Sequence, residues 1–242
     1  MKVYVVNLAT STERMQSMHR QLTELGLPYE RVEAVWGRAL SADALSALYS
    51  ADDNRKRFYR PLSAGEIGCY ASHLQLWQRM VDQAVPMALV LEDDMALDPR
   101  TPALLQALQA SPNDWDMVKL IGMRRAEVAK SWPLMEGFSL VDCKRLPSLT
   151  GAYVIRGSGA TKLARQAAPF SRPIDVELRH CWEFDLRILA VDPYPAHDSE
   201  LAQQTTIGFS RKLSAAERMR KWRYQWRYSL QNAWHRWHRV SR

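Results

Sequence analysis

Cysteine is scarce in this sequence, and long apolar runs are missing. The three cysteines, Cys69, Cys143 and Cys181, are widely spaced, and none forms a Cys-x-x-Cys pair. This usage favours reduced thiols in a cytoplasmic protein. No uncharged apolar stretch approaches the roughly 20 residues that a membrane-spanning helix needs. The apolar part of the N-terminus is too short for a signal peptide and lacks a small-residue cleavage site, so we expect none.

Several familiar catalytic motifs are also missing. The chain has no P-loop, no Gly-x-Ser-x-Gly and no Gly-x-Gly-x-x-Gly. Their absence argues against the common nucleotide-hydrolase, esterase and dehydrogenase sites.

Positive charge is concentrated at one end of the chain. Residues 211–242 hold ten Lys or Arg and one acid, Glu217, which gives +9. The other 210 residues hold 23 bases and 25 acids, or −2, so the two parts sum to the net +7. We therefore divide the chain into a near-neutral domain, residues 1–210, and a basic tail, residues 211–242.

The tail has the pattern of an amphipathic helix. Apolar residues recur there at spacings of three and four, with Arg and Lys beside them: Met219, Trp222, Trp226, Leu230, Ala233, Trp237 and Val240. A Trp-rich stripe flanked by bases predicts a helix that lies in an anionic membrane interface, where each base contributes about 1 kcal/mol. One alternative is a helix packed on the body. Nucleic-acid binding is less favoured and not expected, because the body offers no second basic surface.

Strands alternate with helices along residues 1–210. Short β-branched and apolar runs such as "KVYVVNL" and "ALVL" are separated by helical patterns, two of which open with capping-box spacing, Thr10 with Glu13 and Ser63 with Glu66. This order predicts an α/β/α sandwich with a mostly parallel central sheet. The segment around Trp132 and Pro133 is interpreted as a loop. In such sheets ligands bind at the carboxyl ends of the strands.

Three consecutive carboxylates end one of these strands. Glu92, Asp93 and Asp94 follow the apolar run at residues 88–91. Neighbouring like charges repel by about 1 kcal/mol per pair even in water. Side chains alternate along a strand, so Glu92 and Asp94 point one way and together suit Mg²⁺ or Mn²⁺. The alternative is a capping and salt-bridge cluster before the next helix.

Five blocks of sequence resemble glycosyltransferase family 25, the lipopolysaccharide and lipooligosaccharide core glycosyltransferases and their collagen galactosyltransferase relatives. The blocks occur in family order between about residues 2 and 208: "VVNLATSTER", "GEIGCYASHLQLW", "ALVLEDDMAL", "LTGAYVI" and "PIDVEL". The resemblance implies a GT-A-like, Rossmann-type fold, a nucleotide-sugar donor and inversion at the anomeric carbon. It also implies a divalent metal, Mn²⁺ or Mg²⁺, held by the acidic motif. The metal ligands we expect are Glu92, Asp94 and, from a later loop, His197.

The same resemblance suggests roles for further residues. Inversion needs a base beside the acceptor hydroxyl, for which Asp175 is the first choice and Glu177 the second; the alternative for Asp175 is a helix cap. Gly68 is expected to allow close packing or close ligand approach, while Lys119 either contacts phosphate or is solvated. The donor-binding candidates are Asn7, Leu8, Arg14, Ser72, His73, Asp93, Thr150 and Gly151, with ordinary structural roles as the alternative for Arg14 and His73.

The sequence thus predicts a metal-dependent inverting transferase that moves a hexose, galactose from UDP-galactose as first choice, onto a lipopolysaccharide or lipooligosaccharide core sugar. The acceptor is then a lipid-linked oligosaccharide, and the protein is peripheral on the cytoplasmic face of the inner membrane. The alternatives are a metal-dependent nucleotidyl- or phosphotransferase, and a non-enzymatic membrane or nucleic-acid adaptor that acts through the tail. Nothing in the sequence indicates an oligomeric state.

Overall fold

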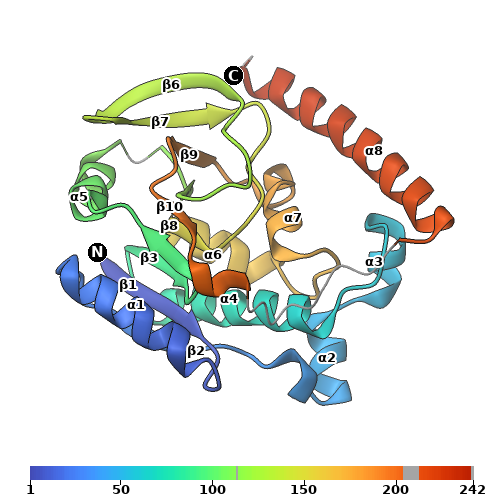
Figure 1. The fold of residues 1–242 in the computed structure, drawn as a ribbon. Helices are drawn as coiled ribbons and strands as arrows, with labels where there is room; N and C mark the ends of the chain where they lie inside the picture. The colour runs from blue at the N-terminus through green and yellow to red at the C-terminus, as the bar shows by residue number, and fades with distance from the viewer. Residues whose placement is uncertain (113, 204–212, 241–242) are drawn as a thin grey trace.

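A computed structural model of the chain describes residues 1–112, 114–203 and 213–240, and its centre is an eight-stranded sheet (Figure 1). Six of the eight strands run in one direction, and only β7 and β8 oppose them. The mostly parallel sheet is confirmed. Its strands, in spatial order, are β2 (Glu30–Glu33), β1 (Lys2–Asn7), β3 (Met87–Glu92), β8 (Ala152–Arg156), β5 (Met117–Lys119), β9 (Ile188–Asp192), β7 (Phe138–Cys143) and β6 (Val128–Met135).

Helices cover both faces of the sheet, so the predicted three layers are also confirmed. On one face α1 (Thr12–Glu24) and α5 (Thr101–Ala110) pack on Val3, Val5 and Leu89. On the other, Tyr4 and Val90 pack with α4 (Ala64–Asp82), α6 (Gly157–Gln166) and α7 (Ile174–Leu178). Alternate residues of a central strand thus enter opposite cores, which is why these strands are apolar throughout.

Smaller elements surround this core. They are the helices α2 (Ala42–Leu48) and α3 (Ala51–Arg57), the 3₁₀ turns η1 (Gly37–Ala39), η2 (Cys181–Phe184) and η3 (Glu200–Gln203), and the strand pair β4 (Met95–Leu97) and β10 (Ala196–Asp198). Gly68 of α4 packs against the backbone of Val35 and Gly37, where a Cβ would collide. Close packing is therefore the role that the structure gives Gly68.

Local signals were accurate at one helix start and wrong at another. The capping box of Ser63 and Glu66 is formed at the start of α4. The Thr10–Glu13 box is wrong, because Ser11 precedes α1 and makes no side-chain capping bond. The loop predicted around Trp132 and Pro133 is strand β6. This strand lies at the edge of the sheet, where a proline without an N–H is tolerated.

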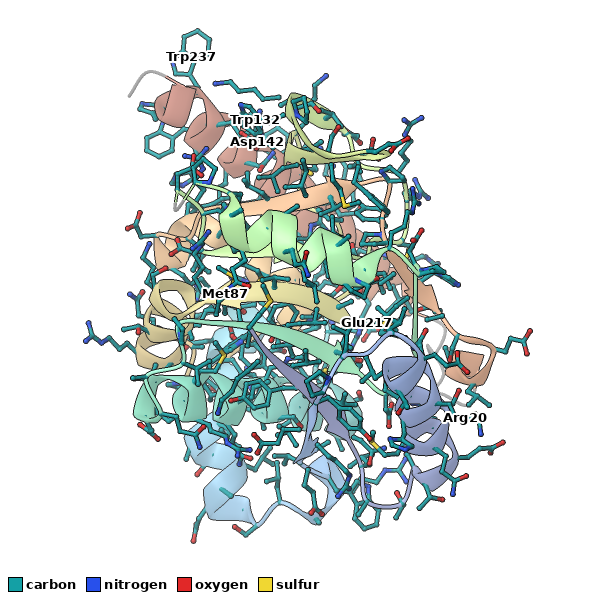
Figure 2. All side chains as sticks on the ribbon, turned by 90° about the vertical axis from the view of Figure 1, so that its left-hand side faces the viewer. Arg20, Met87, Trp132, Asp142, Glu217 and Trp237 are labelled. Atoms are coloured by element: carbon teal, nitrogen blue, oxygen red, sulfur yellow. The ribbon has the colours of Figure 1, made fainter. Side chains whose placement is uncertain are left out.

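The predicted tail helix is present as α8 (Ala215–Val240), and it packs along the body. The Tyr224 ring lies edge-on to Phe58 with centroids 5.5 Å apart, and Tyr228 stacks on Trp182 at 5.9 Å. The C-terminal end of α8 lies beside the β6–β7 hairpin (Figure 1), where Arg236 pairs with Asp142 of β7 at 3.5 Å. Figure 2 shows Trp237, at this end of α8, pointing away from the body. The boundary predicted at residues 210 and 211 falls outside the described residues.

The side of α8 that faces away from the body is apolar. Its exposed residues are Met219, Trp222, Trp226, Leu230, Trp234 and Trp237, of which Trp237 is 75% exposed. Within the described part of the chain, no helix is both long enough and apolar enough to cross a bilayer.

Candidate active site

The three carboxylates lie in a turn at the carboxyl end of β3, directly beside the end of β1. The central one, Asp93, is held from the β1–α1 side. Its carboxylate accepts a hydrogen bond from the Asn7 amide at 2.7 Å and one from the Arg14 guanidinium at 3.2 Å. Both donors are buried, with Arg14 only 6% exposed. The alternative of an exposed arginine on a helix face is therefore wrong, and Asn7 and Arg14 belong to the acidic turn.

Asp94 is the least satisfied of the three acids. Arg14 donates to its Oδ2 at 3.3 Å, whereas its Oδ1 is buried and has no hydrogen-bond partner. Burial raises the pKa of Asp94 to about 7, and the Glu92 and Asp93 charges add to this while Arg14 opposes it. One guanidinium is thus shared between two carboxylates. A buried carboxylate oxygen without a donor is a position that a hard cation fits.

Glu92, the last residue of β3, lies toward α4, whereas Asp93 and Asp94 in the following turn both contact Arg14. The prediction that Glu92 and Asp94 point one way by strand alternation is therefore wrong, because the strand ends at Glu92. The charge of Glu92 still acts on Asp94 and raises its pKa.

His73 Nε2 lies 3.3 Å from the Glu92 Oε1, and His73 Nδ1 lies 2.8 Å from the Tyr153 hydroxyl. Trp77 donates its indole N–H to that hydroxyl at 3.0 Å. Because the hydroxyl already accepts from Trp77, its own proton goes to Nδ1, which leaves Nε2–H to donate to Glu92. His73 therefore orients Glu92 through a buried chain that begins at Trp77.

A second set of possible metal donors lies next to Glu92. Among the described residues, Cys69, His73 and Glu92 form a group whose donor atoms all lie within 4.8 Å of one another. Burial, followed by the charges of Glu92, Asp175 and Asp94, raises the pKa of the Cys69 thiol well above its usual value. A protonated thiol is a poor ligand, and Mg²⁺ and Mn²⁺ prefer oxygen. This group therefore suits those cations less well than the carboxylates do.

The predicted third ligand, His197, lies on β10. This strand pairs with β4, the strand that follows the acidic turn, and His197 is opposite Ala96 in that pair. Ser199 N–H donates to the Asp94 carbonyl at 2.8 Å, which ties the two segments together. His197 itself is exposed, and in the described chain it is not part of a group of three donors. The structure therefore places the segment that carries His197 beside the acidic turn. Among the described residues, the His197 side chain does not form a group of metal donors with the carboxylates there.

The two candidate bases face different surroundings although both lie on α7. The charge of Asp175 acts on Cys69 of α4, whose sulfur lies 3.9 Å from the Glu92 carboxylate, and on Lys119 at the carboxyl end of β5. Glu177 is 4% exposed and pairs with Arg172 at 3.0 Å instead. Residues two apart on a helix point in different directions. Of the two, Asp175 is thus the carboxylate that belongs with the acidic turn.

Two further residues predicted to bind the nucleotide-sugar donor, Ser72 and Leu8, have hydrogen-bond partners within the protein. Ser72 donates to the Gly68 carbonyl at 2.7 Å and accepts from Val35 N–H at 2.8 Å, so both of its hydrogen-bonding roles are used. The Leu8 carbonyl accepts from Ser11 N–H at 2.9 Å.

The Thr150–Gly151 pair lies where the chain enters β8. The side of Gly151 that a Cβ would occupy is filled by Met95, so its missing side chain serves packing there. The Thr150 hydroxyl is buried and has no hydrogen-bond partner.

Lys119 is a site residue whose environment the sequence did not reveal. It is 1% exposed at the end of β5 and donates to the carbonyls of Pro147 and Leu149, so the solvated alternative is wrong. Burial lowers its pKa to about 8, while the Asp175 charge opposes that shift. Lys119 thereby fixes the loop that leads to Thr150. The only signal in the sequence that could have indicated this burial is that Lys119 follows two apolar residues of a strand, Met117 and Val118.

Comparisons with known proteins identify the family. The family model described as "Glycosyltransferase family 25 (LPS biosynthesis protein)" matches residues 1–178. Procollagen galactosyltransferase 1 of Danio rerio is 32% identical over 228 residues, which cover 81% of this chain and 36% of the relative. A glycosyltransferase 25 family member of Aedes aegypti is 32% identical over 184 residues, with 72% and 29% covered. The chain therefore spans about a third of the length of these curated relatives.

Two solved structures show weak similarity to this one. A197 from STIV has a TM-score of 0.41 at 11% identity and covers 78% of this chain, with 81% of its own chain matched. A glycosyltransferase involved in glycosylation of the PBCV-1 major capsid has a TM-score of 0.42 at 10% identity, with 80% and 81% covered. The family match alone spans most of the chain, including the acidic turn and α7. This chain belongs to glycosyltransferase family 25.

Proposed function

We propose that this protein transfers galactose from UDP-galactose to a sugar of a lipopolysaccharide or lipooligosaccharide core, with inversion at the anomeric carbon. The family description names lipopolysaccharide biosynthesis, and several relatives are named as galactosyltransferases. The observation that carries the proposal is the acidic turn, where Asp93 and Asp94 share one guanidinium, Glu92 lies beside them, and Asp94 Oδ1 lacks a partner.

The acidic turn fits a divalent cation, Mn²⁺ or Mg²⁺. Asp94 and Glu92 would hold it, with His197 on the adjoining strand as a further donor. Bound there, the cation would supply charge neutralisation for the diphosphate that leaves. Asn7 and Arg14 hold Asp93 in place, and His73 holds Glu92, so the turn is fixed before any substrate arrives.

Asp175 is the proposed base. An inverting transfer needs a carboxylate that takes the proton of the acceptor hydroxyl as this oxygen attacks the anomeric carbon. The charge of Asp175 acts on residues around the acidic turn, whereas Glu177 is engaged with Arg172. Lys119, on which the charge of Asp175 acts, donates to the Pro147 and Leu149 carbonyls and so anchors the loop before Thr150.

The test is release of UDP from UDP-sugars, with and without Mn²⁺, by the parent protein and by Asp94→Asn. We expect Mn²⁺-dependent release from UDP-galactose and a loss of about 100-fold or more in the variant, because the charge that holds the cation is gone. The matched control is Asp82→Asn, at the other end of α4 from the site, which should release UDP at the parent rate. Calorimetric donor binding should accompany the assay, since hydrolysis without acceptor is slow.

The same assay separates the two carboxylates of α7 and the competing chemistry. Asp175→Asn should lose about 100-fold or more of the transfer rate at unchanged donor affinity, and Glu177→Gln should lose far less. Release of UMP and sugar 1-phosphate instead of UDP would show cleavage at the α-phosphate and identify a nucleotidyl- or phosphotransferase. If no nucleotide sugar is bound or cleaved and Asp94→Asn changes only stability, the proposal is wrong.

We also propose that the protein is peripheral on the cytoplasmic face of the inner membrane, where its lipid-linked acceptor lies. The exposed tryptophans of α8 and the bases beside them support this location. Trp222 and Trp226 are 65% and 61% exposed, although large aromatic rings normally avoid water.

A further inference from the structure

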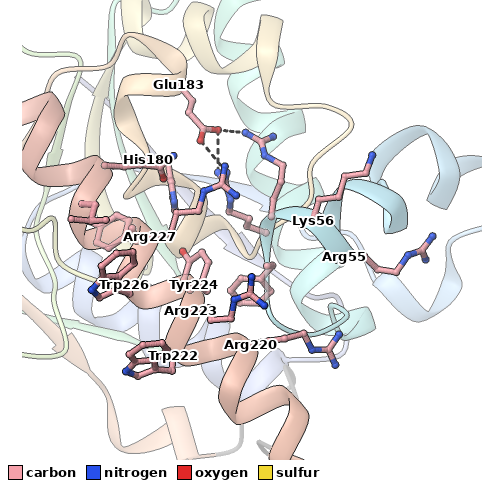
Figure 3. A pocket seen from close by; sticks show the side chains of 16 residues that line it. Arg55, Lys56, His180, Glu183, Arg220, Trp222, Arg223, Tyr224, Trp226 and Arg227 are labelled. Carbon is pink, nitrogen blue, oxygen red and sulfur yellow. Dashed lines mark hydrogen bonds and ion pairs between the residues drawn. The ribbon is translucent and has the colours of Figure 1, made fainter.

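A cavity of about 870 Å³ lies between α8, α3 and η2, and cations dominate its walls. It is separate from the acidic turn, since none of the residues at the ends of β1 and β3 lines it. Figure 3 shows Arg220 and Arg223 of α8 on one side, and Arg55 and Lys56 of α3 on the other. Glu183 of η2 is the only carboxylate among the described lining residues. The seven lining cations are Arg55, Lys56, Arg57, Arg172, Arg220, Arg223 and Arg227.

Glu183 does not neutralise these cations. It is already shared between Arg172, at 2.9 Å, and Arg57. Arg55 and Lys56 pair with Asp52 and Asp53 of their own helix at exposed positions, where ion pairs are worth little. The α8 arginines, Arg220, Arg223 and Arg227, have no acidic partner among the described residues and lie on one helix side at spacings of three and four. Their mutual repulsion would be relieved by a bound anion.

One wall of the cavity is buried and incompletely satisfied. Arg172 is 4% exposed, and its Nε has no hydrogen-bond partner although its other nitrogens bind Glu177 and Glu183. A buried donor without an acceptor is unfavourable, because it has lost its hydrogen bonds to water. It therefore marks a place where a ligand oxygen would stabilise the structure.

Aromatic side chains complete the lining. Phe58, Tyr224 and Tyr228 form the inner wall, between α8 and the body. Cavities of about 300–1,000 Å³ with aromatic walls and a few convergent polar groups suit small ligands rather than an extended polymer. A nucleic acid would need a basic surface that continues beyond the cavity, and residues 1–210 carry a net charge of −2.

We infer that this cavity binds a phosphate-bearing saccharide, with the arginines of α8 and α3 on the phosphate and the aromatic rings on the sugar. The inference rests on the proposed function in one respect, since it identifies this saccharide as part of the acceptor glycan. Helix α7 links the two places: Asp175 acts on the side of the acidic turn, and Glu177 pairs with Arg172 at the cavity. An acceptor phosphate bound in the cavity would then lie on the Glu177 side of α7, while Asp175, the proposed base, lies on the side of the acidic turn.

The test compares three soluble probes by calorimetry: lipid-free core oligosaccharide with its phosphates, the same oligosaccharide after phosphatase treatment, and a single-stranded oligonucleotide. We expect the phosphorylated glycan to bind the parent protein about tenfold or more tightly than the dephosphorylated glycan, because hydrogen bonds between arginine and phosphate are charge-assisted. The double variant Arg223→Ala, Arg227→Ala should lose that preference. A control with the same charge change elsewhere, Arg20→Ala with Lys130→Ala, should keep it; both control residues are exposed.

Equal affinity for the two glycans, or a preference that survives Arg223→Ala with Arg227→Ala, would overturn the inference. Tighter binding of the oligonucleotide would overturn it too, in favour of a nucleic-acid site. The four substituted residues are exposed, and thermal melting checks that each variant is folded. Release of UDP by the parent protein, measured without glycan, reports separately on the proposed function, so the failure of either can be recognised.

Discussion

Two buried titratable residues beneath α8 have pKa values shifted in opposite directions. Burial, reinforced by the nearby Arg172 charge, lowers the pKa of His180 to about 4, and its Nδ1 lies 2.9 Å from the Val176 carbonyl. Burial raises the pKa of Glu177 to about 7 against the opposing charge of Arg172. The folded protein therefore resists protonation of His180 and favours protonation of Glu177.

These shifts predict the pH dependence of stability. As pH falls from about 6.5 to 4, the unfolded chain protonates His180 while the folded protein does not, so His180 lowers the free energy of unfolding over this range. His180→Gln should remove this loss, at most about 1.4 kcal/mol per pH unit.

Between pH 4.5 and 7 the folded protein keeps a proton on Glu177 that the unfolded chain has released, so this residue lowers stability as pH rises. Glu177→Gln should remove that effect.

Urea unfolding of both variants and the parent, at intervals from pH 4.5 to 7, measures these differences. The two variant-minus-parent curves should slope in opposite directions. Equal slopes would show that the two side chains are not buried as described.

At the scale of elements, α8 has two faces with different partners. Tyr224 and Tyr228 pack on the body, and Asn232 donates to the Lys144 carbonyl at 2.9 Å. The apolar stripe predicted from the sequence lies on the other side, with Trp226 61% exposed. Packing on the body and binding to a membrane are thus compatible properties of one helix.

Binding to vesicles tests the outer face. The parent protein should bind vesicles that contain anionic lipid more tightly than neutral ones, and added salt should weaken this binding because it screens the bases. Trp222→Ser with Trp226→Ser should reduce affinity by about tenfold or more, since burying a large apolar side chain contributes about 1.5–3 kcal/mol. Trp36→Ser is the control, because Trp36 is 59% exposed outside α8. Unchanged binding of the double variant, or equal losses in the control, would contradict the membrane proposal.

For the whole molecule, α8 bridges parts of the body that are distant in sequence. It contacts Phe58 after α3, Trp182 in η2 and the Asp142 carboxylate in β7. Tyr228, on the side of α8 that faces the body, is 3% exposed. Burial of these side chains stabilises the packing of α8 on the body.

Removing residues 213–242 should therefore lower the melting temperature. Losing the buried Tyr228 and exposing Phe58 costs about 3 kcal/mol or more, at about 1.5–3 kcal/mol per side chain. Tyr224→Ser with Tyr228→Ser should lower it too, while preserving the length and charge of the chain. Below its melting temperature the truncated protein should still release UDP, because the acidic turn and Asp175 lie within residues 1–203. An unchanged melting temperature would show that α8 does not pack on the body in solution, and loss of all activity below it would favour the adaptor alternative.

The sequence by itself determined the local structure and the position of the acidic turn. Apolar runs predicted the central strands, and Ser63 with Glu66 predicted the start of α4, because these signals depend on residues close together in the chain. The place of Glu92, Asp93 and Asp94 followed from the rule that ligands meet the carboxyl ends of strands. Family resemblance named the remaining candidates without saying which way each side chain faces.

Only the tertiary structure decided which partner each side chain has. Arg14 meets Asp93 across 79 positions, and His73 meets Tyr153 across 80. The Ser72 hydroxyl accepts a hydrogen bond from Val35 N–H. On α7, Glu177 pairs with Arg172, and this contact, which the sequence does not reveal, distinguishes it from Asp175. Hydrogen bonds and burial between distant segments depend on how the sheet brings its strand ends together, so no local pattern encodes them.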